Sequence, residues 1–421
     1  MNNNSIHKNF YDKIKFYPEK IQSQLIELFS ETIKVSSNNL YSIILIGSTA
    51  RNELSYYLTN DEINIHGDYE FIMIFKNKPN NNEIDSYNQL FEILKKKWKI
   101  KSPLFSIDYG VYTLSRLKFL PPTLWLFELQ HFGILVCGES VARMFKEKIT
   151  INNIDKGNLK HLILVRLWNM YMFINDDFIR DKKNDITNVT KHYYARNVLD
   201  IVTVLLPHKK ILEAGYGKRN QIFQTLDIDP KLDLLKPEIN NCYRLKVHME
   251  DSICLSDVSK TFVRGYELLI KEVFDFHLPL TDNSLVEQLI SQKKSFNESR
   301  YKKLKWLFLG LKTFKNYYSF NFTFFHLLRN DRLRKYLILT LIFVHKSIIA
   351  KSVKEKNNYL KESMDLFNII YHKDDLIFET NKSYEYNFFI LRENINNFMV
   401  KYFYGMQNKT IESITKQNKR I

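Results

Sequence analysis

The alternation of apolar and polar residues predicts three short strands in the first third of the chain. Residues 41–46 (YSIILI) form an apolar, partly β-branched run that suits one buried strand and is too short for a helix. Residues 68–75 (DYEFIMIF) and 105–111 (FSIDYGV) also read as strands, because their apolar residues recur at every second position. The sequence therefore predicts a small β-sheet.

Helical spacing of apolar residues surrounds these strands. Residues 18–35 predict an N-terminal helix that packs on the sheet, and residues 83–98 predict a helix between the second and third strands. A Pro-Pro pair precedes a further predicted helix at 123–132, which leads into a glycine-bounded strand at 133–138.

Beyond residue 150 the pattern becomes mostly helical, notably over 158–174 and 191–206, and a linker is expected near 277–285. We therefore expect an α+β protein with a small mixed sheet followed by a large all-helical region. Its expected domains are a sheet domain with N-terminal helices over residues 1–150, a helical domain over 151–280, and an all-helical module without motif chemistry over 286–421.

A glycine and a serine follow the first predicted strand. Gly47 allows a tight turn, and Ser48 is a suitable N-cap for a helix over residues 49–58. The free N–H groups at such a helix start suit a phosphate group, and Arg51 in the first turn would add a bidentate contact.

Three acidic residues form the second cluster of candidate chemistry. Asp68 and Glu70 share one face at the start of their strand, and Asp108 is a lone acid on the polar face of the next one. Carboxylates this close repel each other unless a cation neutralises them, and hard oxygen ligands favour Mg²⁺ or Mn²⁺.

The order of a Gly-Ser turn, an acid-x-acid strand and a later single acid resembles the nucleotidyltransferase superfamily that includes polymerase β and the aminoglycoside nucleotidyltransferases. The resemblance covers roughly residues 40–140. It implies a palm-like domain in which Gly47 and Ser48 hold a triphosphate, Asp68 and Glu70 bind the metal ions, and Asp108 helps to activate the attacking hydroxyl. The chain departs from the pattern in having Glu as its second acid and in a longer spacer, which predicts an extra loop near residues 60–67.

The resemblance extends weakly to the helices that follow. Residues 133–138 and the helix before them are similar to those of bacterial nucleotidyltransferases, many of which are encoded near polysaccharide genes. Lys191, with Arg196 and Asn197, resembles the helix that reaches the triphosphate in the aminoglycoside enzymes, so that 151–280 would close the nucleotide cleft. An exposed lysine without such a role is the alternative for Lys191.

The function that the resemblance implies is Mg²⁺-dependent (or Mn²⁺-dependent) transfer of NMP from an NTP, with ATP as the expected nucleotide. The acceptor would be a hydroxyl of a sugar, a polyol or an antibiotic-like molecule, and pyrophosphate would be released. Two alternatives stay open: transfer to RNA or protein, and a non-catalytic nucleotide-binding module with the same fold.

Composition sets the outer limits. The 421 residues carry a formal net charge of +16, which attracts polyanions and leaves nucleic acid as a possible partner. Lysine, asparagine and isoleucine are all abundant, so a purely compositional origin of this charge is the alternative. A basic amphipathic helix is expected at 302–315. The three cysteines, Cys137, Cys242 and Cys254, show neither metal-site nor disulfide spacing. No signal peptide is evident, and the most apolar run, 336–344, is too short to span a bilayer, so we expect a cytoplasmic protein without a transmembrane segment.

Overall fold

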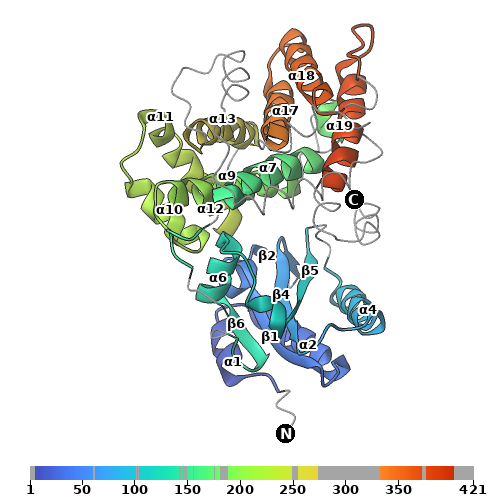
Figure 1. Cartoon of the computed structure of the whole chain (residues 1–421), viewed down its shortest axis with the longest axis vertical. Helices are drawn as coiled ribbons and strands as arrows, with labels where there is room; N and C mark the ends of the chain where they lie inside the picture. The colour runs from blue at the N-terminus through green and yellow to red at the C-terminus, as the bar shows by residue number, and fades with distance from the viewer. Residues whose placement is uncertain are drawn as a thin grey trace. The chain divides into compact units, whose positions relative to one another are not determined.

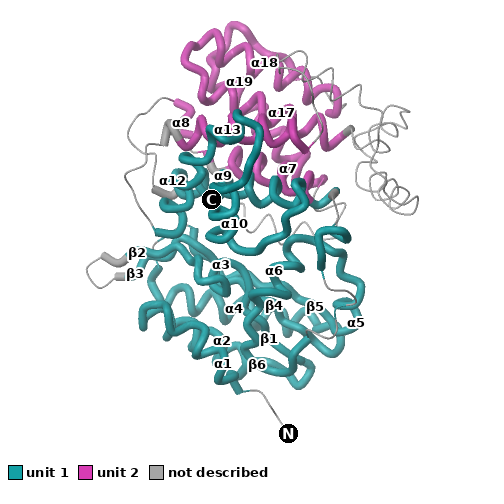
Figure 2. The backbone as a smooth tube through the Cα atoms, turned by 90° about the vertical axis from the view of Figure 1, so that its left-hand side faces the viewer, with its two compact units in different colours: residues 1–158, 187–254 teal, residues 159–186, 255–421 magenta. Residues whose placement is uncertain are grey.

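The chain forms two compact units, residues 1–158 with 187–254 and residues 159–186 with 255–421 (Figure 2). This division differs from the three expected domains, because residues 187–254 group with the sheet, whereas residues 159–186 group with residues 255–421. The computed structural model describes residues 5–59, 62–100, 102, 104–141, 145, 149–154, 156–174, 176–180, 188–248, 255–273, 332–371 and 376–402. The linker expected at 277–285, the basic helix expected at 302–315 and Cys254 lie outside these residues.

The first unit contains a mixed four-stranded sheet with the strand order β5-β4-β1-β6 (Figure 1). Strand β1 runs antiparallel to β4 and to β6, whereas β4 and β5 run parallel. The bounds of these strands are β1 Leu40–Ile46, β4 Asp68–Phe75, β5 Ser106–Thr113 and β6 Ile134–Gly138. The small mixed sheet and the mostly helical remainder confirm the α+β class.

One face of the sheet carries the hydrophobic core. Helices α1 (Lys8–Ile14), α2 (Glu19–Val35) and α4 (Asn81–Trp98) contribute to it. Phe71 of β4 meets Phe29 edge-on, with ring centroids 5.3 Å apart, and its neighbour Tyr69 donates a hydrogen bond to Gln24 Oε1 at 2.9 Å. The odd-numbered residues of β4 thus face the helices, which leaves its even-numbered residues on the opposite face.

The opposite face receives two short helices and α6. Helix α3 (Gly47–Ala50) follows β1, α5 (Leu114–Leu117) follows β5, and α6 (Leu124–Phe132) contacts β1 and α3. The first unit is completed by α9 (Asn188–His208), α10 (Tyr216–Thr225), α11 (Pro230–Asp233) and α12 (Lys236–His248), of which α9, α10 and α12 pack on one another.

Among its described residues, the second unit contains helices and no strand. Its helices are α7 (Lys156–Phe173, from residue 159 onward), α8 (Asp176–Ile179), α13 (Leu255–Val273), α17 (Arg332–Ile349), α18 (Val353–Asn368) and α19 (Tyr384–Val400). His345 of α17 lies with Nε2 2.9 Å from the carbonyl oxygen of Leu167, which ties α17 to α7. None of the described helices is both long and apolar enough to cross a membrane.

The predicted helix over 49–58 is wrong. Helix α3 ends at Ala50, Asn52 takes a left-handed φ of 58°, and the chain continues as strand β2 (Tyr56–Thr59). Strand β2 pairs antiparallel with β3 (Glu62–Ile65), so part of the expected extra loop at 60–67 is the second strand of a hairpin. The backbone N–H and C=O groups of β2 find their partners in β3, whereas in a helix they would bond to groups a few residues away.

Candidate functional site

Strands β4 and β5 bring the three predicted acids onto one face of the sheet. The register places Glu70 opposite Asp108 and Asp68 opposite Ser106, so their side chains lie on the same side of two neighbouring strands. Ser106 donates a hydrogen bond from Oγ to Asp68 Oδ1 at 2.8 Å, which orients that carboxylate. The acids are therefore grouped at the start of both strands.

The electrostatics of this group reflect mutual repulsion in a partly buried position. Burial raises the pKa of Glu70 to about 6; Asp68 and Asp108 raise it as well, while Arg196 and Arg51 oppose the rise. The pKa of Asp108 is also raised, by burial first and then by Asp68. Such coupled, raised carboxyl pKa values are typical of sites that bind cations or move protons.

The Gly47 turn lies directly against the acids. Gly47 has a φ of +70°, a backbone conformation that favours glycine, and a Cβ atom there would lie 2.5 Å from Glu70 Oε2, so a larger residue would displace that carboxylate. Thr49 donates from Oγ1 to the carbonyl oxygen of Asp68 at 3.1 Å. Ser48 lies within α3 rather than capping it, since the N-cap position is Ile46.

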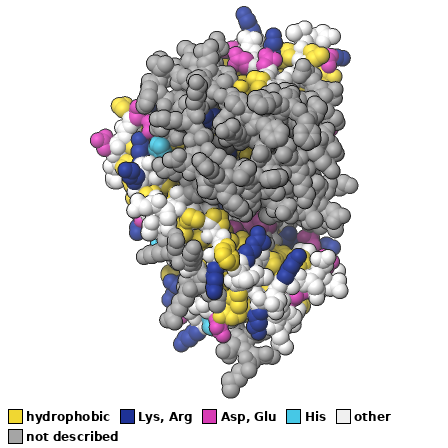
Figure 3. All heavy atoms as spheres, in the orientation of Figure 1, with side chains coloured by type: hydrophobic (Ala, Val, Ile, Leu, Met, Phe, Trp, Pro, Cys, Tyr) yellow, Lys and Arg dark blue, Asp and Glu magenta, His cyan; other side chains and the backbone are white. Residues whose placement is uncertain are grey.

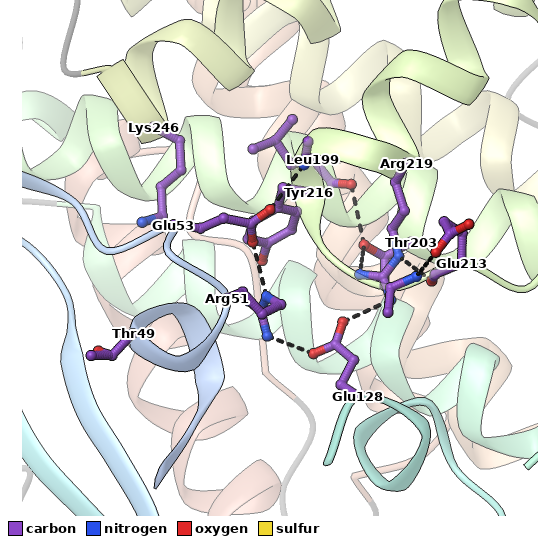
Figure 4. A network of polar contacts seen from close by, with 12 residues as sticks. Thr49, Arg51, Glu53, Glu128, Leu199, Thr203, Glu213, Tyr216, Arg219 and Lys246 are labelled. Atoms are coloured by element: carbon purple, nitrogen blue, oxygen red, sulfur yellow. Dashed lines mark hydrogen bonds and ion pairs between the residues drawn. The ribbon is translucent and has the colours of Figure 1, made fainter. Parts of the chain in front are cut away.

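The guanidinium of Arg51 is paired with the carboxylates of Glu53 and Glu128. Its Nε donates to Glu53 Oε2 at 2.8 Å and its Nη1 to Glu128 Oε2 at 2.7 Å, in the network that Figure 4 shows. The side chain of Arg51 is 8% exposed. The expected bidentate contact from Arg51 to a phosphate is therefore replaced by two contacts to carboxylates.

The same network joins the turn after β1 to helices α6 and α10. Arg219 Nη2 lies 2.7 Å from Glu128 Oε1, and the backbone N–H of Gly217 donates to Glu53 Oε1 at 2.9 Å (Figure 4). Glu128 thus bridges Arg51 and Arg219 and has a structural role.

Arg196 is the basic residue of α9 that acts on the acids. Burial disfavours its charge, but Tyr216 and Asp68 outweigh that effect and raise its pKa, and Arg196 in turn opposes the rise at Glu70. Lys191 is buried in the same helix. Five residues correspond to about 140° around a helix axis, so Lys191 and Arg196 face different directions.

Sequence reasoning missed Lys246, which α12 places beside the hairpin. Lys246 Nζ contacts Ser55 Oγ, and Ser55 donates to the carbonyl oxygen of Lys246 at 2.7 Å. Burial lowers the pKa of Lys246 to about 7, as does Arg196, while Glu53 and Asp68 oppose the shift. No local signal marks this lysine, because its partners lie almost two hundred positions earlier.

The acids have the chemistry of a magnesium site but do not form a closed cage. Among the described residues, no three histidine, cysteine or carboxylate side chains already stand close enough to enclose a metal ion. Mg²⁺ is usually bound through one or two carboxylates together with waters and substrate phosphates. The carboxylates of Asp68, Glu70 and Asp108 fit that mode of binding.

Comparison with known proteins adds no family. The chain matches no family model, no curated protein and no solved structure.

Proposed function

We propose that the first unit is a metal-dependent nucleotidyltransferase. The grouping of Asp68, Glu70 and Asp108 on one face, directly against the Gly47 turn, supports this function best. The charge of Asp68 raises the carboxyl pKa of both Glu70 and Asp108, so holding these acids ionised together is costly unless a cation compensates them.

In this proposal Asp68, Glu70 and Asp108 hold Mg²⁺ or Mn²⁺, which supplies charge neutralisation for the triphosphate and its transition state. The Gly47–Ser48 turn holds the polyphosphate beside Glu70 through backbone amides, and Arg196 adds a fixed positive charge from α9. Arg51 acts as a positioning residue, because its partners Glu53 and Glu128 fix the end of that turn.

The reaction is an in-line displacement at the α-phosphorus. A bond forms between the acceptor oxygen and the α-phosphorus, the bond from that phosphorus to the bridging oxygen breaks, and pyrophosphate leaves with the electron pair. Asp108, whose carboxyl pKa is raised, accepts the proton of the acceptor hydroxyl.

The experiment is pyrophosphate release from each NTP in the presence of Mg²⁺, measured for the parent and for Asp68→Ala. We expect release by the parent, loss of at least a hundredfold in Asp68→Ala, and matched melting of both proteins. Asp85→Asn is the control, because Asp85 is an exposed acid on α4, a helix that packs on the other face of the sheet. An Asp68→Ala protein as active as the parent removes the assignment, and metal-dependent nucleotide binding without release favours the non-catalytic module.

The net charge of +16 favours a second acceptor class, RNA. On the face drawn in Figure 3, the described lysine and arginine side chains lie among hydrophobic and other polar ones. To distinguish the acceptor classes, labelled NTP is added with the protein to a cell extract, and the size of the labelled product is measured. A labelled small molecule supports a sugar, polyol or antibiotic-like acceptor, and labelled RNA or protein supports the macromolecular alternatives.

A further inference from the structure

The face that carries the acids continues along β5 as an aromatic surface. Asp108, Gly110 and Tyr112 occupy successive positions on that face, because side chains two residues apart share a side of a strand. Tyr112 and Trp125 of α6 stack with ring centroids 5.8 Å apart and an interplanar angle of 26°. Both rings are partly exposed. We refer to Tyr112 and Trp125 as the aromatic platform.

Gly110 brings the platform close to the acids. A Cβ atom on Gly110 would lie 3.0 Å from Tyr112 Cε2 and 3.4 Å from Ile72 Cγ2, so the tyrosine ring leans back over Gly110 toward Asp108. The charge of Glu70 acts on Tyr112, since it contributes to the raised pKa of that phenol after burial, against the effect of Arg116. The ring therefore lies within electrostatic reach of the acids.

The helix that carries Trp125 is held by the network described above. Glu128 lies three residues later on α6, less than one helical turn, and is fixed by Arg51 and Arg219 at 2.7 Å each. The platform is thus attached to a helix whose position is set by buried ion pairs.

The strand order places Tyr112 of the platform away from the Gly47 turn. The Gly47 turn follows β1, whereas Asp108 and Tyr112 lie on β5, which is the edge strand on the far side of β4. If the triphosphate lies at the Gly47 turn, the acceptor lies on the other side of the acids. Tyr112, which follows Asp108 on β5, is then in a position to contact the acceptor. This step rests on the proposed function.

We infer that the aromatic platform of Tyr112 and Trp125 binds the ring of the acceptor, and that the acceptor is a pyranose-type sugar or sugar phosphate. A pyranose has apolar C–H groups on its faces and hydroxyls at its rim. Asp108 lies four residues before Tyr112, about 13 Å back along the strand, and the tyrosine ring that leans over Gly110 covers about half of that distance, so a pyranose stacked on the platform presents a rim hydroxyl toward Asp108. Exposed Arg116 beside Tyr112 disfavours a polycationic antibiotic.

The test measures pyrophosphate release at saturating NTP and Mg²⁺ with four acceptor probes: methyl α-glucopyranoside, glucose 6-phosphate, glycerol and kanamycin. Slow release to water alone is measured first, and its absence in the parent counts against the proposed function itself. Given release to water, we expect the two pyranoses to stimulate it more than glycerol or kanamycin. Release that neither pyranose stimulates overturns the inference and leaves the proposed function standing.

Variants then locate the effect on the platform. Trp125→Leu should raise the KM for the better pyranose about tenfold, a larger change than in the KM for NTP. Trp125→Phe should restore most of the acceptor affinity, because it keeps a stacking ring. An unchanged acceptor KM in Trp125→Leu, or a parallel loss of acceptor-dependent and water-dependent release at matched melting, overturns the inference.

Discussion

Replacing Glu70 by glutamine should stabilise the protein at neutral pH while removing its activity. Glutamine keeps the shape of the side chain and removes the charge that Asp68 and Asp108 repel. A residue whose charge is unfavourable in the fold and required for a reaction is the pattern expected of a functional site.

The size of the effect follows from the pKa. Burial and the neighbouring acids raise the pKa of Glu70 from 4.5 to about 6. At about 1.4 kcal/mol per pKa unit this corresponds to roughly 2 kcal/mol, and solvent screening of the partly exposed side chain reduces it to about 1–2 kcal/mol. The pKa of Glu70 is higher in the folded state than in the unfolded state. The contribution of Glu70 to the free energy of unfolding is therefore fully present below pH 4.5 and is lost as the pH rises through 6.

The assay is urea unfolding of the parent and of Glu70→Gln at pH 4 and pH 8 without divalent metal. We expect free energies of unfolding that agree within about 0.5 kcal/mol at pH 4, and a variant more stable by about 1–2 kcal/mol at pH 8. The control is Glu31→Gln in the exposed Lys34–Glu31 pair, which should change stability by less than about 0.5 kcal/mol at either pH. A Glu70→Gln protein less stable than the parent at pH 8 refutes the reasoning.

Three further substitutions test other parts of the site by urea unfolding. Gly47→Ala should cost about 1–2 kcal/mol for the left-handed backbone alone, and displacement of Glu70 should lower pyrophosphate release at least tenfold. Glu128→Ala should cost roughly 3–5 kcal/mol, because Arg219 loses the carboxylate 2.7 Å away in a buried setting. Lys246→Met should be more stable than the parent at pH 6, and the difference should shrink as the pH rises from 7 toward 10.5, because the parent lysine releases its proton in the fold first.

A different result would contradict each of these three predictions. Gly47→Ala with parent stability and activity means that the turn is not tightly packed on Glu70. A decrease of less than about 1 kcal/mol in the free energy of unfolding of Glu128→Ala means that water solvates the guanidinium groups of Arg51 and Arg219 in place of the carboxylate. A stability difference for Lys246→Met that does not vary with pH means that this lysine keeps an ordinary pKa.

The strands and the acid face could be predicted from the sequence because both depend on local alternation. In residues 68–75 the apolar odd positions and the acidic start of the even positions fix which side faces the core. Once Asp108 occupies the matching face of the next strand, parallel pairing with β4 brings the acids together.

The role of Arg51 could not be predicted, because it depends on contacts distant in sequence. Whether its guanidinium faces a phosphate or two carboxylates is decided by Glu128, which lies 77 positions later on α6. The helix expected over 49–58 failed for a similar reason, since pairing between β2 and β3 competes with local helix propensity.

The central claim is that Asp68 and Asp108 act as parts of one metal–nucleotide site. Metal-dependent pyrophosphate release should be measured for the parent, Asp68→Asn, Asp108→Asn and the double variant, with cooperative unfolding confirmed for each protein. We expect each single substitution to reduce release about as much as the double one, because groups that act as a unit are not additive. Parent-like release in the double variant would show that Asp68 and Asp108 do not form such a site.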